Sequence, residues 1–162
     1  MALLQNAVSA LAAQAGWRQP VQADDGAYHF RLAGELDFAV FSPDGRQCVI
    51  RATLMSVPDT GAERDELLAL VAQRQVGACR TRASTVALEK AGDNLLRESM
   101  QGERLILYRL TDMSSGQEAL NLSVRDFLND LAWWKAACGS PAQVVHEQPV
   151  FSMPGMFVGS RY

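Results

Sequence analysis

The side chains that most often carry catalysis are scarce in this chain and poorly spaced for it. Two histidines occur among the 162 residues, His29 and His146. His29 falls on the solvent-facing side of a predicted strand, and His146 follows the last predicted helix. Catalysis by a serine or cysteine nucleophile usually needs a histidine base held beside that nucleophile. The placement of the two histidines therefore predicts no catalytic residues.

Two pairs of carboxylates are the remaining candidates for proton exchange with a substrate. Asp24 and Asp25 precede a glycine, which is typical of a turn. Glu35 and Asp37 are expected at the wet edge of a strand, so we interpret both pairs as structural. A second hypothesis stays open, in which the protein is an enzyme or binds a small ligand in a pocket of a curved sheet. Its polar anchors would be Glu35, Asp37 or Tyr108.

The cysteines and glycines do not form a recognisable metal or phosphate site. Cys48, Cys79 and Cys138 lie far apart, and no histidine accompanies them at the spacing of a metal site. Three is an odd number, which suits small buried thiols in a reducing compartment better than a disulfide framework. Gly155 and Gly159 do not match a phosphate-binding loop. We therefore expect no metal and no cofactor.

The composition is that of one ordinary globular domain. Hydrophobic residues make up 48% of the chain and charged residues 20%, with a formal net charge of -3. This acidic balance disfavours nucleic acids and membrane surfaces as partners, because both are anionic. Residues 1–16 lack the basic start of a secretion signal, and no apolar run approaches the roughly 20 residues of a transmembrane helix. We expect a cytosolic protein that neither binds nucleic acid nor inserts into membranes.

Three amphipathic helices are predicted from apolar residues that recur every three to four positions. The first ends at Gly16, and the second follows a capping box formed by Thr60 and Glu63. The third begins at Ser123, which heads a Ser-x-x-Asp cap, and ends at Gly139. The apolar stripes contain Leu3, Leu4, Ala7, Val8, Leu11 and Ala15 in the first helix, Leu67, Leu68, Leu70 and Val71 in the second, and Val124, Phe127, Leu128, Leu131 and Trp134 in the third.

Between the first two helices, apolar and polar residues alternate as they do in strands. Strands are predicted at 28–32, 36–40 and 48–57, and residues 42–45 have the sequence of a type I turn. These segments predict a three-stranded antiparallel meander.

The segment after the second helix is harder to assign. Residues 84–90 could continue that helix or form a strand. We favour the strand, because its Ser-Thr-Val start is poor helix and residues 91–94 suit a hairpin turn. Further strands are predicted at 94–99 and 104–111.

Apolar residues occur where a wet surface is expected. The strands at 48–57 and 104–111 are apolar on both faces, and Phe41 points opposite to Phe38. More apolar residues occur at Trp133, Trp134, Met153, Met156 and Phe157. Monomers rarely leave such surface uncovered. This pattern predicts a dimer interface, a polypeptide-binding surface or both, and a thicker core is the alternative.

The order of elements and the opening residues resemble the class I type III secretion chaperones, the Tir-chaperone or CesT-like family, and within it the YscB type. The likeness is closest over residues 1–58 and extends more loosely through 62–138. It is carried by Leu3-Leu4-Gln5-Asn6, Leu11-Ala12-Ala13, Gly16, Ala23-Asp24, Gly26-Ala27-Tyr28, Pro43-Asp44-Gly45 and Val49-Ile50-Arg51.

The resemblance implies an α+β fold with the order α-β-β-β-α-β-β(-β)-α, in which a curved antiparallel sheet packs against helices. A single domain would span residues 1–138. Residues 139–162 would form a C-terminal extension that is either loosely ordered or docked.

The resemblance also implies a chaperone of the bacterial cytoplasm. It would bind the extended N-terminal region of a secreted effector or gatekeeper protein and keep it secretion-competent without catalysis. It would act as a homodimer or as a heterodimer with a second small chaperone. Client contacts are expected at Leu4, Val8, Leu11, Phe38, Phe41, Val49 and Met55, with dimer contacts at Leu67, Leu70 and Val71.

Overall fold

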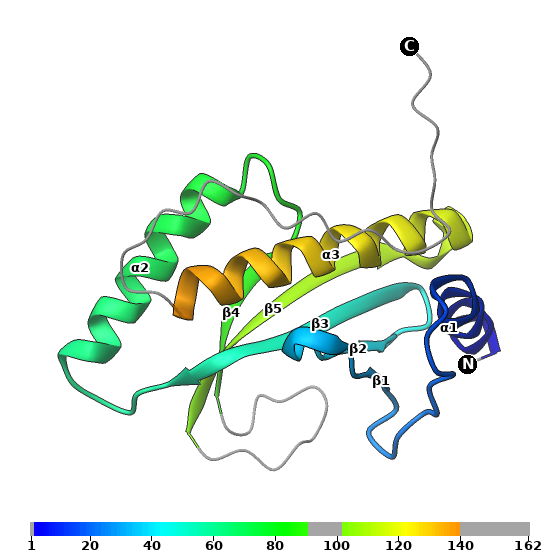
Figure 1. Cartoon of the computed structure of the whole chain (residues 1–162), viewed down its shortest axis with the longest axis horizontal. Helices are drawn as coiled ribbons and strands as arrows, with labels where there is room; N and C mark the ends of the chain where they lie inside the picture. Colours follow the sequence, from blue (N-terminus) through cyan, green and yellow to red (C-terminus); the bar gives the residue numbers. More distant parts are fainter. Residues whose placement is uncertain (1, 91–101, 140–162) are drawn as a thin grey trace.

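The structure, a computed structural model, describes residues 2–90 and 102–139 (Figure 1). Helices and one antiparallel sheet confirm the expected α+β class. The elements in chain order are α1 (Ala2–Ala15), β1 (Tyr28–Phe30), η1 (Ala33–Glu35), β2 (Phe38–Phe41), β3 (Gln47–Val57), α2 (Ala62–Ala78), β4 (Thr85–Lys90), β5 (Glu103–Asp112), η2 (Met113–Ser115) and α3 (Gly116–Gly139). The predictions made for 91–94, for 94–99 and for the extension beyond Gly139 lie outside the described residues.

The sheet has five strands in the order β1-β2-β3-β5-β4, and every neighbouring pair is antiparallel. β2 and β3 form the hairpin that the turn at 42–45 predicts. Asp44 stabilises this turn, because its Oδ1 accepts bonds of 2.9 and 2.8 Å from the backbone amides of Arg46 and Gln47. The longest pairing joins β3 to β5. Its register shifts between Thr53 and Met55, which marks a bulge at Leu54.

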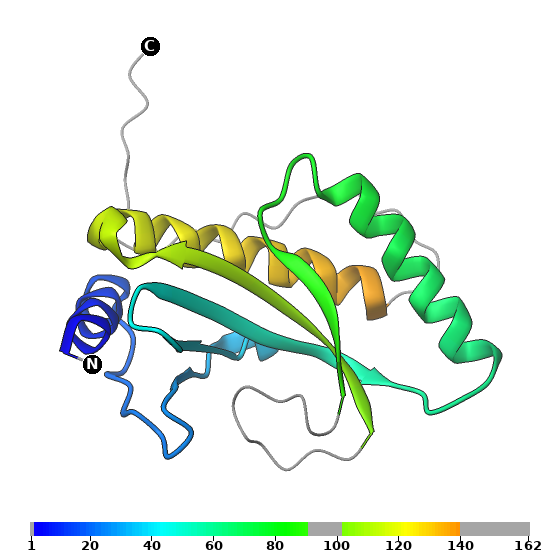
Figure 2. The same cartoon turned by 180° about the vertical axis from the view of Figure 1, so that it is seen from behind.

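α3 crosses one face of the sheet, with α1 beside its first half and α2 beside its last half (Figures 1 and 2). The face of α3 that meets the sheet is apolar, and Trp134 and Phe127 on it are fully buried. Burial of an aromatic side chain of this size contributes on the order of 3 kcal/mol or more to folding. The α3 layer is therefore the centre of the core. Its other fully buried large side chains include Val8, Leu11, Val40, Ile50, Leu105, Leu107, Val124, Leu128 and Leu131.

The opposite face of the sheet carries a second, smaller apolar cluster. It consists of Ala27, Ala39, Phe41 and Val49, each with at most 7% of its surface exposed. The strands are therefore apolar on both faces because one face packs into the main core under α3 and the other carries this far-face cluster. A thicker core, the alternative left open above, accounts for part of the unexpected hydrophobicity.

α2 is attached to the rest of the domain by arginine side chains. Arg64 donates a 3.1 Å bond to the carbonyl of Pro58 and also pairs with Glu103 on β5. Arg74 donates a 2.9 Å bond to the carbonyl of Ala137 near the end of α3. These contacts hold both halves of α2 against neighbouring elements, so its orientation does not depend on apolar packing alone.

One predicted helix cap and one predicted helix start are wrong. α2 begins after Gly61, whose φ of 97° suits glycine, and no side chain caps it, so the Thr60–Glu63 capping box does not form. α3 begins at Gly116, and Ser123 is a buried residue inside it. The helix start was misplaced because the first turns of α3 are polar, as loops usually are. The predicted strand at 84–90 is confirmed as β4.

Among the described residues, no helix combines the length and the apolarity needed to cross a membrane.

Candidate functional site

The second half of β3 forms an open edge of the sheet. β2 is four residues long, whereas β3 has eleven, and β2 pairs only with residues 49–51 of β3. On that side, residues 52–57 have no partner among the described strands, although they pair with β5 on the other side. Unpaired backbone donors and acceptors on an edge strand favour the addition of another strand. We call residues 52–57 the β3 edge.

The chain leaves β3 uncovered because it turns away before β2 begins. β1 ends at Phe30, and η1 follows at Ala33–Glu35, where Gly34 has a φ of 74° that favours glycine. The chain re-enters the sheet only at Phe38, opposite the middle of β3. A longer β1–β2 hairpin would have covered the β3 edge. The short turn through Gly34 therefore determines where the edge opens.

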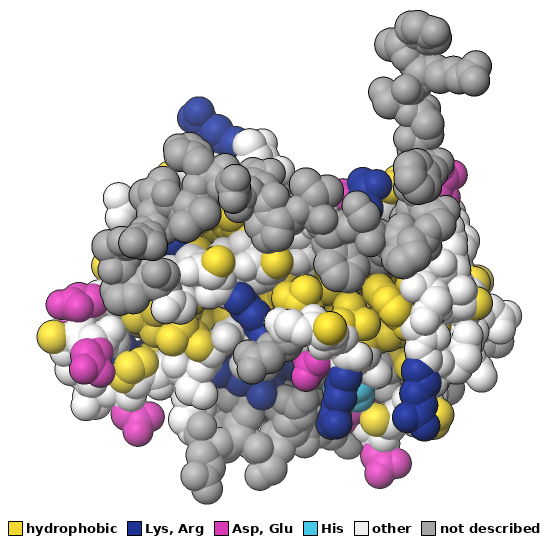
Figure 3. Space-filling model, in the orientation of Figure 1, with side chains coloured by type: hydrophobic (Ala, Val, Ile, Leu, Met, Phe, Trp, Pro, Cys, Tyr) yellow, Lys and Arg dark blue, Asp and Glu magenta, His cyan; other side chains and the backbone are white. Residues whose placement is uncertain are grey.

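The side chains of the β3 edge are mixed in polarity and partly exposed. Thr53 and Ser56 are exposed, whereas Leu54 and Met55 are half-buried against the main core. Figure 3 shows hydrophobic side chains gathered in a band across the middle of this side of the molecule, with basic side chains near its centre. An extended chain lying along the β3 edge could therefore hydrogen-bond to the backbone of β3 and pack against the apolar side chains beside it.

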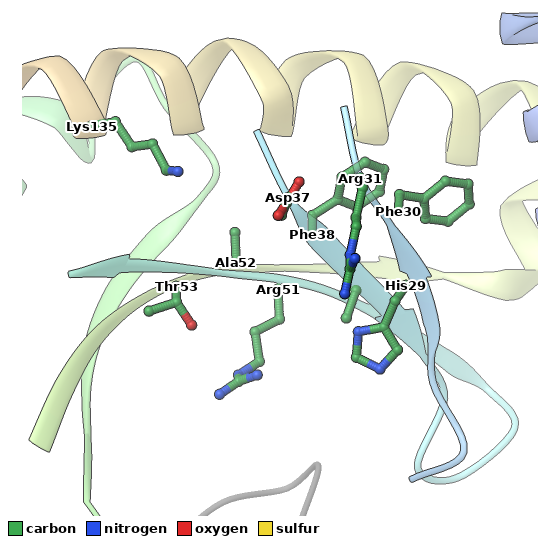
Figure 4. Close-up of a pocket in the computed structure, with 10 residues that line it drawn as sticks. His29, Phe30, Arg31, Asp37, Phe38, Arg51, Ala52, Thr53 and Lys135 are labelled. Carbon is green, nitrogen blue, oxygen red and sulfur yellow. The ribbon is translucent and has the colours of Figure 1, made fainter. Parts of the chain in front are cut away.

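A pocket of about 570 Å³ lies at the end of this edge, beside the start of β2. Figure 4 shows Lys135 reaching from α3, and Asp37 from the start of β2, on the helix side of the sheet. Thr53 and Arg51 project from the opposite side. The pocket thus opens on both sides of the sheet, around its edge. The lining comprises His29, Phe30, Arg31, Asp37, Phe38, Ala39, Arg51, Ala52, Thr53 and Lys135.

Basic side chains outnumber acidic ones in this lining. Arg31, Arg51 and Lys135 carry positive charge, and Asp37 is the carboxylate of the lining. Arg51 is 4% exposed and pairs with Glu89 on β4, so it is held in place from within the sheet. Arg31 is exposed and makes no ion pair with another described residue. The pocket therefore has a fixed cation in its wall and an exposed cation at its mouth.

The other edge of the sheet, β4, is partly covered. Gln75 on α2 accepts a 3.1 Å hydrogen bond at its Oε1 from the backbone amide of Val86. This amide points away from β5, on the side where a further strand would pair. A side chain that occupies an edge donor blocks strand addition at that point. β3 therefore offers the more accessible edge.

The predicted client-contact residues fall into three groups. Leu4, Val8, Leu11 and Phe38 belong to the main core, and none is more than 8% exposed. Phe41 and Val49 form part of the far-face cluster. Met55 alone of the seven lies on the β3 edge and is half-buried. The structure therefore brings these residues onto three different surfaces.

The predicted dimer-contact residues all lie on α2, with different burial. Val71 is 8% exposed, and Leu67 packs against the main core. Leu70 is half-buried outside that core. Val76 on the same helix and Leu88 on β4 are 73% and 37% exposed. Sequence reasoning missed these two, and it also missed Arg31, Thr53 and Lys135 at the pocket. The unequal lengths of the predicted second and third strands were the signal for an open edge.

Two anchors of the small-ligand hypothesis, Asp37 and Tyr108, are not brought together. Asp37 lines the pocket, whereas Tyr108 lies on β5 opposite Arg51 and outside the lining. Glu35 is the last residue of η1, and its side chain is outside the described set. Within residues 2–90 and 102–139, no group of three or more metal-ligating side chains gathers.

Neither a known family model nor a curated protein sequence matches this chain. Solved structures do match its fold. A chain in the crystal structure of the ExsC–ExsE complex has a TM-score of 0.60 at 9% identity, covering 83% of this chain and 92% of that one. A chain in the HopA1–SchA chaperone–effector complex has a TM-score of 0.56 at 10% identity, covering 83% and 94%.

A third match comes from the Yersinia pestis type III secretion chaperone SycH in complex with a stable fragment of YscM2. Its TM-score is 0.51 at 8% identity, and the match covers 83% of this chain and 98% of that one. This chain has the fold of a type III secretion chaperone. The resemblance noted in the sequence is therefore confirmed at the level of the fold.

Proposed function

We propose that this protein is a type III secretion chaperone. It binds the extended N-terminal region of a secreted effector or gatekeeper protein in the bacterial cytoplasm and keeps that region secretion-competent, without catalysis. The β3 edge carries this proposal, because it offers six consecutive residues that, among the described strands, have no partner on one side. The matched structures support it, since two of them contain a chaperone bound to another polypeptide.

Binding proceeds by strand addition. A client segment that pairs with the β3 edge satisfies its own backbone groups and those of β3, which supplies affinity for almost any sequence. Side chains of an added strand alternate between the two sides of the sheet. One set meets Leu54 and Met55 at the margin of the main core, and the other set meets Thr53 on the far side. Holding a segment in this way keeps it extended and covers its apolar side chains.

The active unit is a dimer that is formed through α2 and β4. Leu70, Val76 and Leu88 leave apolar surface on these two elements, and a helix packed on its counterpart would cover it. The partner is a second copy of this chain or a different small chaperone. The second arrangement, with a gatekeeper as client, corresponds to the YscB type.

A small-molecule ligand remains the second candidate, because the pocket is large enough for one and contains Asp37 and Lys135. It predicts that compounds bind to the purified protein without any polypeptide. The chaperone proposal predicts instead that a polypeptide protects the β3 edge.

Co-expression tests the chaperone proposal. The protein is produced together with N-terminal segments of secreted proteins encoded beside it, then purified by size exclusion and identified by mass spectrometry. We expect one such segment to elute with the protein at a fixed ratio. A protein that elutes as a monomer and retains none of these segments would contradict the proposal. A control segment from the globular C-terminal part of the same client should not be retained.

A further inference from the structure

The charge at the end of the β3 edge suggests what part of a client binds there. The pocket beside the edge is lined by Arg31, Arg51 and Lys135, with Asp37 as the carboxylate of the lining and Glu89 paired with Arg51 behind it. The chain as a whole carries a net charge of -3. A local excess of basic side chains on an acidic protein is therefore a feature of this place and not of the composition.

The cations come from three elements that the fold brings together. Arg31 follows β1, Arg51 is central in β3, and Lys135 lies in the last half of α3. Arg51 is fixed by Glu89, which also accepts a 2.6 Å bond from Arg104 Nε. Lys135 also interacts within the chain. Arg31 is exposed and is the cation most accessible to an incoming group.

The pocket also has an apolar wall. Phe30 and Phe38 stack with ring centroids 4.7 Å apart, and Ala52 lies beside them on β3. A group that enters the pocket therefore meets hydrocarbon on one side and positive charge on the other. A glutamate or aspartate side chain has a short apolar stem and a negative tip, which fits both surfaces.

The added strand would carry such a side chain to the pocket. A strand paired with the β3 edge lies about 4.8 Å from β3 and runs toward the start of β2, where the pocket begins. The residue of the client that reaches this end occupies the position that a longer β2 would have filled. Its side chain therefore points to Lys135 on one side of the sheet or to Arg51 on the other, and Arg31 lies farther along, beside the first two strands.

We infer that the pocket is a specificity site for an acidic side chain of the client, so that a preferred client segment is extended and apolar with one aspartate or glutamate at the end beside β2. This inference rests on the proposed function. Glu89 balances Arg51, and Asp37 offsets one of the two remaining cations, Arg31 and Lys135, so the charge left over matches a single acid.

A peptide array provides the test. Ten-residue peptides that alternate valine and threonine are attached to a membrane, and one central residue is glutamate, glutamine or lysine. The full-length protein is applied at low and at high salt. We expect the glutamate peptide to bind roughly fivefold more strongly than the glutamine peptide. The preference should shrink at high salt, because screening weakens exposed charge pairs.

Charge reversal identifies the residues responsible. Arg31→Glu and Lys135→Glu should abolish the preference for glutamate and favour the lysine peptide. Arg46→Glu changes the net charge equally but lies in the turn between β2 and β3, so it should leave the preference intact. Arg31→Gln checks that a neutral side chain removes the preference without reversing it.

The outcomes separate the two proposals. Equal binding of all three peptides would overturn the specificity site and still support strand addition. A preference for lysine in the unaltered protein would overturn it as well, in favour of a basic client. If no peptide of the array binds, strand addition itself fails and the inference fails with it.

Discussion

Arg51 and Glu89 form an ion pair that is almost completely enclosed by the protein, at 4% and 5% exposure. Arg104 donates a second, 2.6 Å bond to the same carboxylate, so the three residues join β3, β4 and β5. Removing two charges from water is costly, and mutual pairing offsets that cost only while both partners are present. This network therefore stabilises the middle of the sheet only as a complete set.

Replacing the shared carboxylate exposes this dependence. Glu89→Ala leaves two buried or half-buried guanidinium groups without their common acceptor, and we expect it to lower the free energy of unfolding by about 3 kcal/mol. Urea denaturation followed by circular dichroism measures the change. Glu118→Ala, at an exposed position in α3, serves as the control and should change stability by less than about 0.5 kcal/mol. An equal loss in both variants would refute the proposed role of the network.

Cysteine reactivity provides a second test at this scale. Burial raises the pKa of the Cys48 thiol to about 12, so almost no thiolate forms near neutral pH. Cys79 is exposed at the end of α2. We expect a thiol reagent at pH 8 to modify Cys79 within minutes and to leave Cys48 intact until denaturant is added. Mass spectrometry of the alkylated peptides reports both. Modification of Cys48 in the native protein would contradict its placement in the core.

The elements show what the sequence could predict and what it could not. The strands of the meander and β4 were predicted because alternation and poor helix formers are local signals. The start of α3 was missed because its first turns are polar. Gln117 donates a 3.0 Å bond to the carbonyl of Ala7 on α1, and Asn121 bonds to Gln14 on that helix. Only the packing of α1 against α3 explains these polar residues.

The candidate site was harder to predict than the fold. An open edge depends on which strands pair and over what length, and pairing is a long-range property. Periodicity correctly marked Leu4, Val8 and Leu11 as one stripe, but it could not say whether that stripe faces the core or a partner. In the structure the stripe faces the core. Met55 is the predicted client contact that also lies on the β3 edge.

Gln75 on α2 protects the β4 edge of the sheet, whereas no such contact is described for the β3 edge, and this difference can be tested. Gln75→Ala removes the acceptor that occupies the amide of Val86, so we expect faster hydrogen exchange at that amide and a loss of about 1 kcal/mol in stability. Hydrogen exchange read by NMR detects the change at a single residue. Gln73→Ala, an exposed position on the same helix, is the matched control. Unchanged exchange at Val86 would show that α2 does not protect the β4 edge.

At the scale of the whole molecule, α2 and β4 carry the proposed dimer. Leu70→Asp places a charge in the middle of this surface, and we expect it to raise the dissociation constant of the dimer by roughly thirtyfold. Light scattering after size exclusion gives the mass at each concentration. Leu3→Asp makes the same change at a leucine of α1 that is 61% exposed, and it should leave the dimer intact. A Leu70→Asp protein that stays dimeric would place the interface elsewhere.

The central claim is that a client polypeptide adds a strand at the β3 edge. Hydrogen–deuterium exchange of the full-length protein, alone and bound to the co-purified client segment, tests it most directly. In the complex, we expect exchange to slow by about tenfold or more at those amides of residues 52–57 that point away from β5, because an added strand hydrogen-bonds to the free side of β3. The amides of β4 should change much less. Unchanged exchange at 52–57 in a complex that has formed, with protection at β4 or on α2 instead, would contradict the claim.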